Sequence, residues 1–285
     1  MTEDRLQWQK ATQERKVERF YGTGAERYVD FHDGYLNFGF WEEGISDYVA
    51  AAENLVLHLA TLCGINGDSR LLDVACGMGT QDILLFRNLH PESIDGLDVT
   101  WKHIEHGRRR ASKAGFGEHV QFHHGTAVDL PFPEANFSHV VSIEGPVHFN
   151  TREKFMREAF RVLRPGGVLG MSDYVVKRRP KGPLEIALIA AARRFWKIPK
   201  ENVDSSSSYT AKLERSGFTN VKIEEVGEQV IPGYYFEQMR PETRQAITKI
   251  RGSLAHKGTI VIDVAAYQAY KRGLIDYIFV RAEKP

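Results

Sequence analysis

A glycine-rich turn and the acidic residues near it are the features of the sequence most informative about chemistry. Gly77 and Gly79 follow an apolar run that ends at residue 74, and Asp98 ends the next apolar run. Glycine adopts positive φ freely and lets a ligand approach the backbone without meeting a Cβ atom. A helix that begins after the turn would also offer unpaired N–H groups. The pattern therefore predicts a site for a nucleotide-type cofactor.

The residues around the turn indicate which cofactor binds there. A dinucleotide fingerprint needs a third glycine in G-x-G-x-x-G, and the chain has none at that position after Gly79. Asp73 precedes the glycines and Asp82 follows them; negative charge here disfavours a pyrophosphate and suits a ligand with an ammonium group. S-adenosylmethionine has such a group. The missing third glycine and the charges of Asp73 and Asp82 argue against a nicotinamide-dependent oxidoreductase.

Five segments of the chain resemble the class I S-adenosylmethionine-dependent small-molecule methyltransferases and occur in that family's order. Each motif is moderately common alone, but the ordered set is specific. The resemblance covers about residues 66–176 and implies a Rossmann-like fold and methyl transfer. The five segments are Asp73–Thr80, Gly96–Thr100, Gly125–Phe132, Phe137–Glu144 and Arg161–Gly167.

The resemblance also implies how the cofactor is held. The loop from Asp73 to Gly79 would meet the methionine end, Asp98 would bind both ribose hydroxyls, and the backbone of Ala127 would hold the adenine edge. Thr126 stands where many members have an aspartate that accepts from the adenine amino group; a hydroxyl accepts more weakly than a carboxylate. The cofactor-binding residues expected are Tyr21, Tyr28, Asp73, Ala75, Gly77, Gly79, Asp98, Val99, Thr126 and Ala127.

Glu144 and His148 are the candidate catalytic residues. They belong to a Glu-Gly-Pro-Val-His segment after the fourth expected strand, where the resembling family places groups that touch cofactor and acceptor. A carboxylate stabilises nearby positive charge, and either side chain could take the proton that an acceptor loses. Glu144 could equally bind only the cofactor or cap a turn, and His148 could be a packed histidine.

Aromatic and basic side chains are the candidates for acceptor binding. Residues 28–41 are crowded with aromatics and glycine, as in relatives that close such a segment over the sulfonium, and aromatic faces attract cations. The basic cluster at residues 177–181 could grip a diphosphate, although charge clusters are more often solvated. The expected acceptor-binding residues are Phe38, Trp41, Arg178, Tyr234 and Tyr235.

The positions of these residues require an α/β fold, a Rossmann-like seven-stranded mostly parallel sheet with helical lid segments. Apolar strand-like runs alternate with helical stretches, which predicts right-handed crossovers and a site at the carboxyl ends of the strands. Helices are expected over residues 80–89, 101–114, 152–163, 184–195 and 207–217. Strands are expected over residues 70–74, 93–98, 120–124, 138–143, 168–176, 220–226 and 274–281.

The chain divides into a lid and a core. We expect residues 1–65 to form an N-terminal helical lid segment and residues 66–285 to form the S-adenosylmethionine-binding core. Breaker-rich or polar stretches mark insertions at about 177–206 and 231–272, and these are expected to cap the acceptor.

Composition limits the partners and the location. A net charge of +1 gives no general attraction to nucleic acid or membrane, and no Asn/Asp-Pro-Pro-aromatic motif follows the fourth expected strand. Cys63 and Cys76 are the only cysteines, so we do not expect a disulfide framework. We therefore expect a cytoplasmic location. The N-terminal residues do not have the pattern of a signal peptide, and no apolar run is long enough for a membrane span. The histidines lack metal-site spacing, so no metal is expected; a homodimer is compatible with the sequence.

The sequence favours transfer of a methyl group from S-adenosylmethionine to oxygen or carbon of a small, largely apolar metabolite in an enclosed pocket. One alternative is C-methylation of a prenyl diphosphate alkene, with Glu144 stabilising or deprotonating the cation. A second alternative is a non-catalytic S-adenosylmethionine-binding protein.

Overall fold

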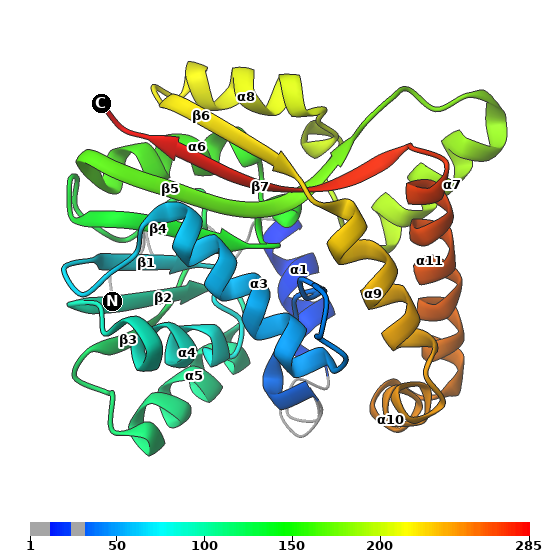
Figure 1. Cartoon of the computed structure of the whole chain (residues 1–285), viewed down its shortest axis with the longest axis horizontal. Helices are drawn as coiled ribbons and strands as arrows, with labels where there is room; N and C mark the ends of the chain where they lie inside the picture. Colours follow the sequence, from blue (N-terminus) through cyan, green and yellow to red (C-terminus); the bar gives the residue numbers. More distant parts are fainter. Residues whose placement is uncertain (1–11, 24–31) are drawn as a thin grey trace.

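A single seven-stranded sheet organises the chain in the computed structural model, which describes residues 12–23 and 32–285 (Figure 1). The strand order is β3-β2-β1-β4-β5-β7-β6. The pairs from β3 to β5 are parallel, and β7 runs antiparallel to both β5 and β6. The strands are β1 (Arg70–Val74), β2 (Ser93–Asp98), β3 (Val120–His124), β4 (Phe137–Ile143), β5 (Leu163–Val176), β6 (Thr219–Glu225) and β7 (Ile275–Glu283). The expected mostly parallel Rossmann-like sheet is confirmed.

Helices cover both faces of the sheet and bury two apolar clusters. Helices α3 (Tyr48–Cys63), α4 (Thr80–Leu89) and α5 (Trp101–Ala114) pack over one cluster, while α6 (Arg152–Val162) and α8 (Ser206–Arg215) pack over the other. Burial of apolar area in these clusters is the main force that orders the layers. No helix among the described residues is long and apolar enough to cross a membrane.

Helix α3 belongs to the core, and this changes the lid expected over residues 1–65. Its Asp47 cap accepts a hydrogen bond from Ala50 N–H, and Gly64 ends the helix with φ of 73°. Between these ends Leu55, Leu59 and their neighbours form a fully buried stripe against the sheet. Among the residues described before β1, the cavity is lined mainly by α1 (Thr12–Gly22), the short helix η3 (His32–Gly34) and the irregular segment after it, with Tyr48 at the start of α3.

Four helices gather beyond the carboxyl ends of the strands, on the right of Figure 1. They are α7 (Gly182–Phe195), α9 (Gly227–Met239), α10 (Pro241–Arg251) and α11 (Ser253–Lys271). Helix α11 contacts α7, α9 and α10, so the two expected excursions form one structure, which we call the helical cap. The second excursion begins earlier than expected, because residues 227–230 already belong to α9.

Candidate active site

A cavity of about 320 Å³ lies between the carboxyl ends of the strands and the helical cap. Its walls include the glycine turn, the ends of β2 and β4, helix α1 and residues of α7, α9 and α11. Residues far apart in the sequence therefore meet in one cavity, as the parallel sheet predicts.

Backbone conformation shapes the glycine turn at the floor of this cavity. Ala75, Gly77 and Gly79 all have positive φ, at 68°, 57° and 72°. A Cβ atom on Gly79 would lie 2.5 Å from the Phe122 ring, so only glycine fits there. Ala75 and Gly77 line the cavity, whereas Gly79 is the N-cap of α4 and does not line it. The turn thus presents backbone, and little side chain, to a ligand.

Asp98 is held in place and kept charged at the end of β2. Its carboxylate accepts hydrogen bonds from Gly77 N–H at 3.0 Å and Thr100 N–H at 2.7 Å. Burial opposes ionisation, but His103, 3.4 Å away, and these two N–H donors outweigh it and hold the pKa of Asp98 below its ordinary value. Asp98 and the adjacent Val99 line the cavity, so an oriented carboxylate acceptor faces any ligand.

Asp73 lies under the turn and does not line the cavity. Its side chain is fully buried and accepts a hydrogen bond from the Gln81 amide. Burial is the main cause that raises the pKa of Asp73 to about 7, and it raises the pKa of the neighbouring buried Asp82 well above its ordinary value. Gln81, which does line the cavity, was not expected from the sequence.

Glu144 faces the cavity at the end of β4. Its Oε1 accepts hydrogen bonds from Phe38 N–H at 2.8 Å and from the Tyr277 hydroxyl at 2.9 Å. Desolvation by burial raises the pKa of Glu144 to about 8, and these donors only partly offset it. A cation placed in the cavity would favour its ionised form.

His148 ends the short helix η4 (Pro146–His148) and faces the same cavity. Its Nε2 shares a hydrogen bond of 2.9 Å with the Tyr21 hydroxyl of α1. Burial lowers the pKa of His148 to about 4, so the ring is neutral at pH 7. Tyr21 lines the cavity as well.

A buried polar network fixes the η4 loop that carries His148. The Nδ2 of Asn202 donates to the carbonyl groups of Pro146, Val147 and Phe149 at 3.3, 3.1 and 2.8 Å. Its Oδ1 accepts from Arg152 N–H at 3.0 Å. Asn202 comes from the first excursion, so this segment supports the loop as well as covering the cavity.

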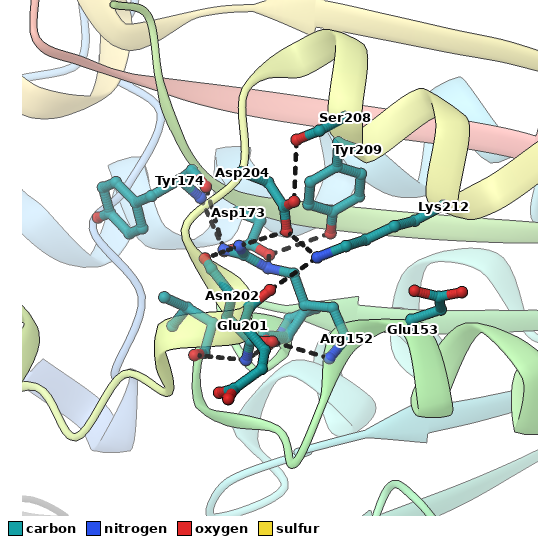
Figure 2. A network of polar contacts seen from close by, with 12 residues as sticks. Arg152, Glu153, Asp173, Tyr174, Glu201, Asn202, Asp204, Ser208, Tyr209 and Lys212 are labelled. Carbon is teal, nitrogen blue, oxygen red and sulfur yellow. Dashed lines mark hydrogen bonds and ion pairs between the residues drawn. The ribbon is translucent and has the colours of Figure 1, made fainter. Parts of the chain in front are cut away.

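Arg152 anchors that network, as Figure 2 shows. Its guanidinium is fully buried, donates to both carboxylate oxygens of Asp173 at 2.7 and 2.8 Å, and lies 3.2 Å from Asp204. Tyr209 donates to Asp173, and Lys212 donates to Asp204. Because these partners satisfy a buried charge, loss of one would leave an uncompensated group and be strongly destabilising.

Thr126 and Ala127 form the cavity wall after β3, where the resemblance places the adenine. The Thr126 hydroxyl donates to the carboxylate of Glu14, a buried residue of α1, at 3.5 Å. No motif pointed to Glu14, because the contact depends on how α1 docks and not on local spacing.

The expected acceptor residues divide into two groups. Phe38 and Tyr234 line the cavity and stack on each other at 3.7 Å. Trp41 and Tyr235 do not line it: Trp41 donates to the Phe38 carbonyl and Tyr235 stacks on Tyr267 at 4.2 Å.

Arg178 is also outside the cavity wall. Its guanidinium donates to both carboxylate oxygens of Glu185 at 2.8 and 3.0 Å and to the Arg272 carbonyl. Tyr28, an expected cofactor residue, lies outside the described residues. In the described parts of the chain no group of three or more histidine, cysteine or acidic residues is arranged to hold a metal.

Comparison with known proteins adds relatives that span nearly the whole chain. Residues 71–167 match a family described as "Methyltransferase domain". Erythromycin 3''-O-methyltransferase of Saccharopolyspora erythraea is 29% identical over 91% of this chain and 88% of its own length. The 27-O-demethylrifamycin SV methyltransferase of Amycolatopsis mediterranei is 27% identical over 93% of this chain and 96% of its own length.

Other similarities are shorter or concern the fold. Sterol 24-C-methyltransferase of Yarrowia lipolytica is 30% identical over 61% of this chain and 47% of its own length. The structure of geranyl diphosphate C-methyltransferase from Streptomyces coelicolor A3(2) aligns with a TM-score of 0.76 and 16% identity over 97% of this chain and 99% of that one. The structure of the [4+2]-cyclase SpnF aligns with a TM-score of 0.76 and 23% identity over 95% of this chain and 96% of that one. These two structures share the fold.

Proposed function

We propose that this chain, a class I S-adenosylmethionine-dependent methyltransferase of small molecules, methylates a hydroxyl oxygen of a largely apolar metabolite. The observation that carries the choice of oxygen is the position of the His148 imidazole, which lies in the wall of a cavity that the helical cap also lines and is hydrogen-bonded to the Tyr21 hydroxyl. An alcohol must lose a proton on methylation, and a neutral imidazole can accept one. The name of the Saccharopolyspora relative, an O-methyltransferase, supports the same choice.

The residues at the floor of the cavity fit the cofactor. The turn of Ala75 and Gly77 leaves room for close approach to backbone, Asp98 offers a charged acceptor suited to ribose hydroxyls, and the wall at Ala127 would face the adenine. When bound, S-adenosylmethionine supplies an electrophilic methyl group on a positively charged sulfur with a thioether leaving group. Asp73 would act indirectly, by supporting the turn from below.

His148 would take the acceptor's proton, and Glu144 would stabilise positive charge beside it. The Tyr21 hydrogen bond restrains the imidazole ring of His148, and the donors Phe38 N–H and Tyr277 hydroxyl restrain the carboxyl group of Glu144. Holding the acceptor in line supplies up to about 7–11 kcal/mol, whereas a general base adds roughly 10²–10⁴-fold. Orientation by the cavity walls is therefore the larger contribution, and His148 adds the smaller one.

The test is formation of S-adenosylhomocysteine from a panel of hydroxylated apolar metabolites that includes 27-O-demethylrifamycin SV, with geranyl diphosphate as a competing class. We expect turnover of a hydroxylated compound, and kcat lower by about 10²-fold or more in His148→Ala. Binding of S-adenosylhomocysteine, measured by calorimetry, controls for folding of the variant. Full activity of both His148→Ala and Glu144→Gln would contradict the assigned roles.

C-methylation of an isoprenoid alkene is a second candidate, favoured by the aromatic rings around Glu144. Phe38 stacks on Tyr234, Tyr174 lies edge-on to Phe38, and Tyr277 donates to the carboxyl group. Aromatic faces and a carboxylate together stabilise a carbocation. The version of this candidate with a prenyl diphosphate substrate lacks the residue that was expected to bind the diphosphate, because Arg178 is paired with Glu185 outside the cavity wall.

The finer expectations on partners and location stay proposals. The net charge of +1 supports an acceptor other than nucleic acid. The two unpaired cysteines support a cytoplasmic location. Homodimer formation stays a prediction from the sequence. A non-catalytic role would require cofactor binding without turnover on any compound of the panel.

A further inference from the structure

Glu14 combines burial, a position in the cavity wall and an unused hydrogen-bond acceptor. Its side chain is 7% exposed and lines the cavity from α1. One carboxylate oxygen, Oε1, accepts from the Thr126 hydroxyl at 3.5 Å. The other, Oε2, is buried and has no hydrogen-bond partner among the residues that the structure describes.

An acceptor of this kind indicates a ligand with a donor. Leaving a buried polar atom without a partner costs about 1–3 kcal/mol, and more for a charged group, so nearly all buried polar groups in folded proteins are satisfied. The Thr126 hydroxyl donates to Oε1 and leaves Oε2 without a partner among the described residues. A ligand that donates hydrogen bonds at this wall would satisfy the oxygen that is left.

We infer that Glu14 supplies the carboxylate that binds the 6-amino group of the cofactor's adenine. The inference rests on the proposed function, since it assumes that the adenine lies at Thr126 and Ala127. Many members of the family carry an aspartate at the position of Thr126. Here a carboxyl group from α1 stands next to that threonine, so a separate element supplies the acceptor that the loop lacks.

The same helix is tied to the catalytic side of the cavity. The Nε2 of Gln13 donates to the backbone carbonyl groups of His148 and Lys197 at 3.0 and 2.6 Å, and the Tyr21 hydroxyl reaches the His148 ring. Recognition of the adenine through Glu14 therefore depends on the docking of α1 that also positions the base.

The experiment changes Glu14 and the 6-amino group of the ligand in turn and together. The binding affinity is measured each time by calorimetry, without an acceptor. The probes are S-adenosylhomocysteine and its analogue with hydrogen in place of the 6-amino group. We expect the wild type to bind the analogue about tenfold more weakly or worse. Glu14→Leu should bind both probes with nearly equal affinity, and Glu14→Gln, which keeps an acceptor oxygen, should lie between them. Thr126→Asp introduced into Glu14→Leu should restore the preference for the amino group.

Glu18→Gln is the matched control, because Glu18 lies on the same helix and does not line the cavity; it should keep the wild-type preference. If Glu14→Leu unfolds, the Glu14→Gln variant carries the test. If the wild type and all folded Glu14 variants showed the same ratio of affinities for the two probes, the inference would be overturned and the proposed function would stand. Failure of the wild type to bind S-adenosylhomocysteine at millimolar concentration would instead overturn the proposed function.

Discussion

Glu144 is a carboxyl group whose ionisation opposes folding, and this gives a prediction at the scale of one residue. Its pKa in the ligand-free fold, about 8, lies above the ordinary value of 4.5. The folded state therefore binds a proton that the unfolded state has released between these values. The stabilisation is fully present below pH 4.5 and is lost as pH rises to about 8.

We expect Glu144→Gln to flatten this dependence. The free energy of unfolding of the wild type, measured with denaturant and without ligand, should fall more between pH 5 and pH 8 than that of the variant. Asp73 acts in the same direction and His148 in the opposite one, but both are present in each protein. Parallel pH profiles for the two proteins would show that Glu144 titrates near its ordinary value.

Single residues differ in how far the sequence predicted them. The glycine turn, Asp98 and Glu144 were predicted to meet, and they do, because each stands at the end of a strand and the strands are parallel. Glu14 was not predicted, since its contact with Thr126 spans 112 positions and depends on the docking angle of α1. Arg178 was predicted from charge alone, and charge does not reveal a partner such as Glu185.

At the scale of elements, Asn202 links η5 (Lys200–Asn202) to η4 (Pro146–His148). Because one amide holds the carbonyl groups of the loop, Asn202→Ala should let His148 move out of position. We expect kcat to fall about tenfold or more with little change in the affinity for S-adenosylhomocysteine.

The matched control is Asn88→Ala, whose exposed amide bonds only within its own helix; it should behave as the wild type. The measurements are steady-state kinetics on an accepted substrate and calorimetry. If Asn202→Ala lost affinity for S-adenosylhomocysteine by the same factor as kcat, the variant would have a general structural defect, and Asn202 would have no specific positioning role.

The regular elements of the core follow from local pattern. Strands β1, β2 and β3 and helices α4 and α5 have the predicted bounds, because apolar periodicity and glycine stops act over short distances. Helix α3 has the same kind of pattern as a lid helix would, and only its burial against the sheet shows that it belongs to the core. Layer assignment is a tertiary property that periodicity does not contain.

At the scale of the whole molecule, the two thiol groups report on the integrity of the apolar cluster that α3, α4 and α5 cover. Cys63 and Cys76 are buried and unpaired, and burial raises the pKa of Cys63 to about 12 and that of Cys76 well above its ordinary value. We expect the native protein to react slowly with Ellman's reagent and both thiols to react once guanidinium unfolds it. Rapid reaction of either thiol in the native protein would show that its region opens locally.

The acceptor side is the part of the molecule that the sequence predicts least. Its walls combine α1, the irregular segment with Phe38, and the helical cap. Each of these segments is recognisable as an excursion, but the shape they enclose depends on contacts such as the Phe38–Tyr234 stack and the hydrogen bond from Trp41 N–H to the Gln229 carbonyl. Such contacts leave no periodic trace.

The strands β6 and β7 are adjacent and antiparallel, so the chain between them departs from and returns to one corner of the sheet. Exchange of residues 227–273 between homologous enzymes would therefore join two fixed points, while the glycine turn and Asp98 stay untouched. A lineage could acquire a new acceptor by recombination at these two junctions and keep its methyl donor.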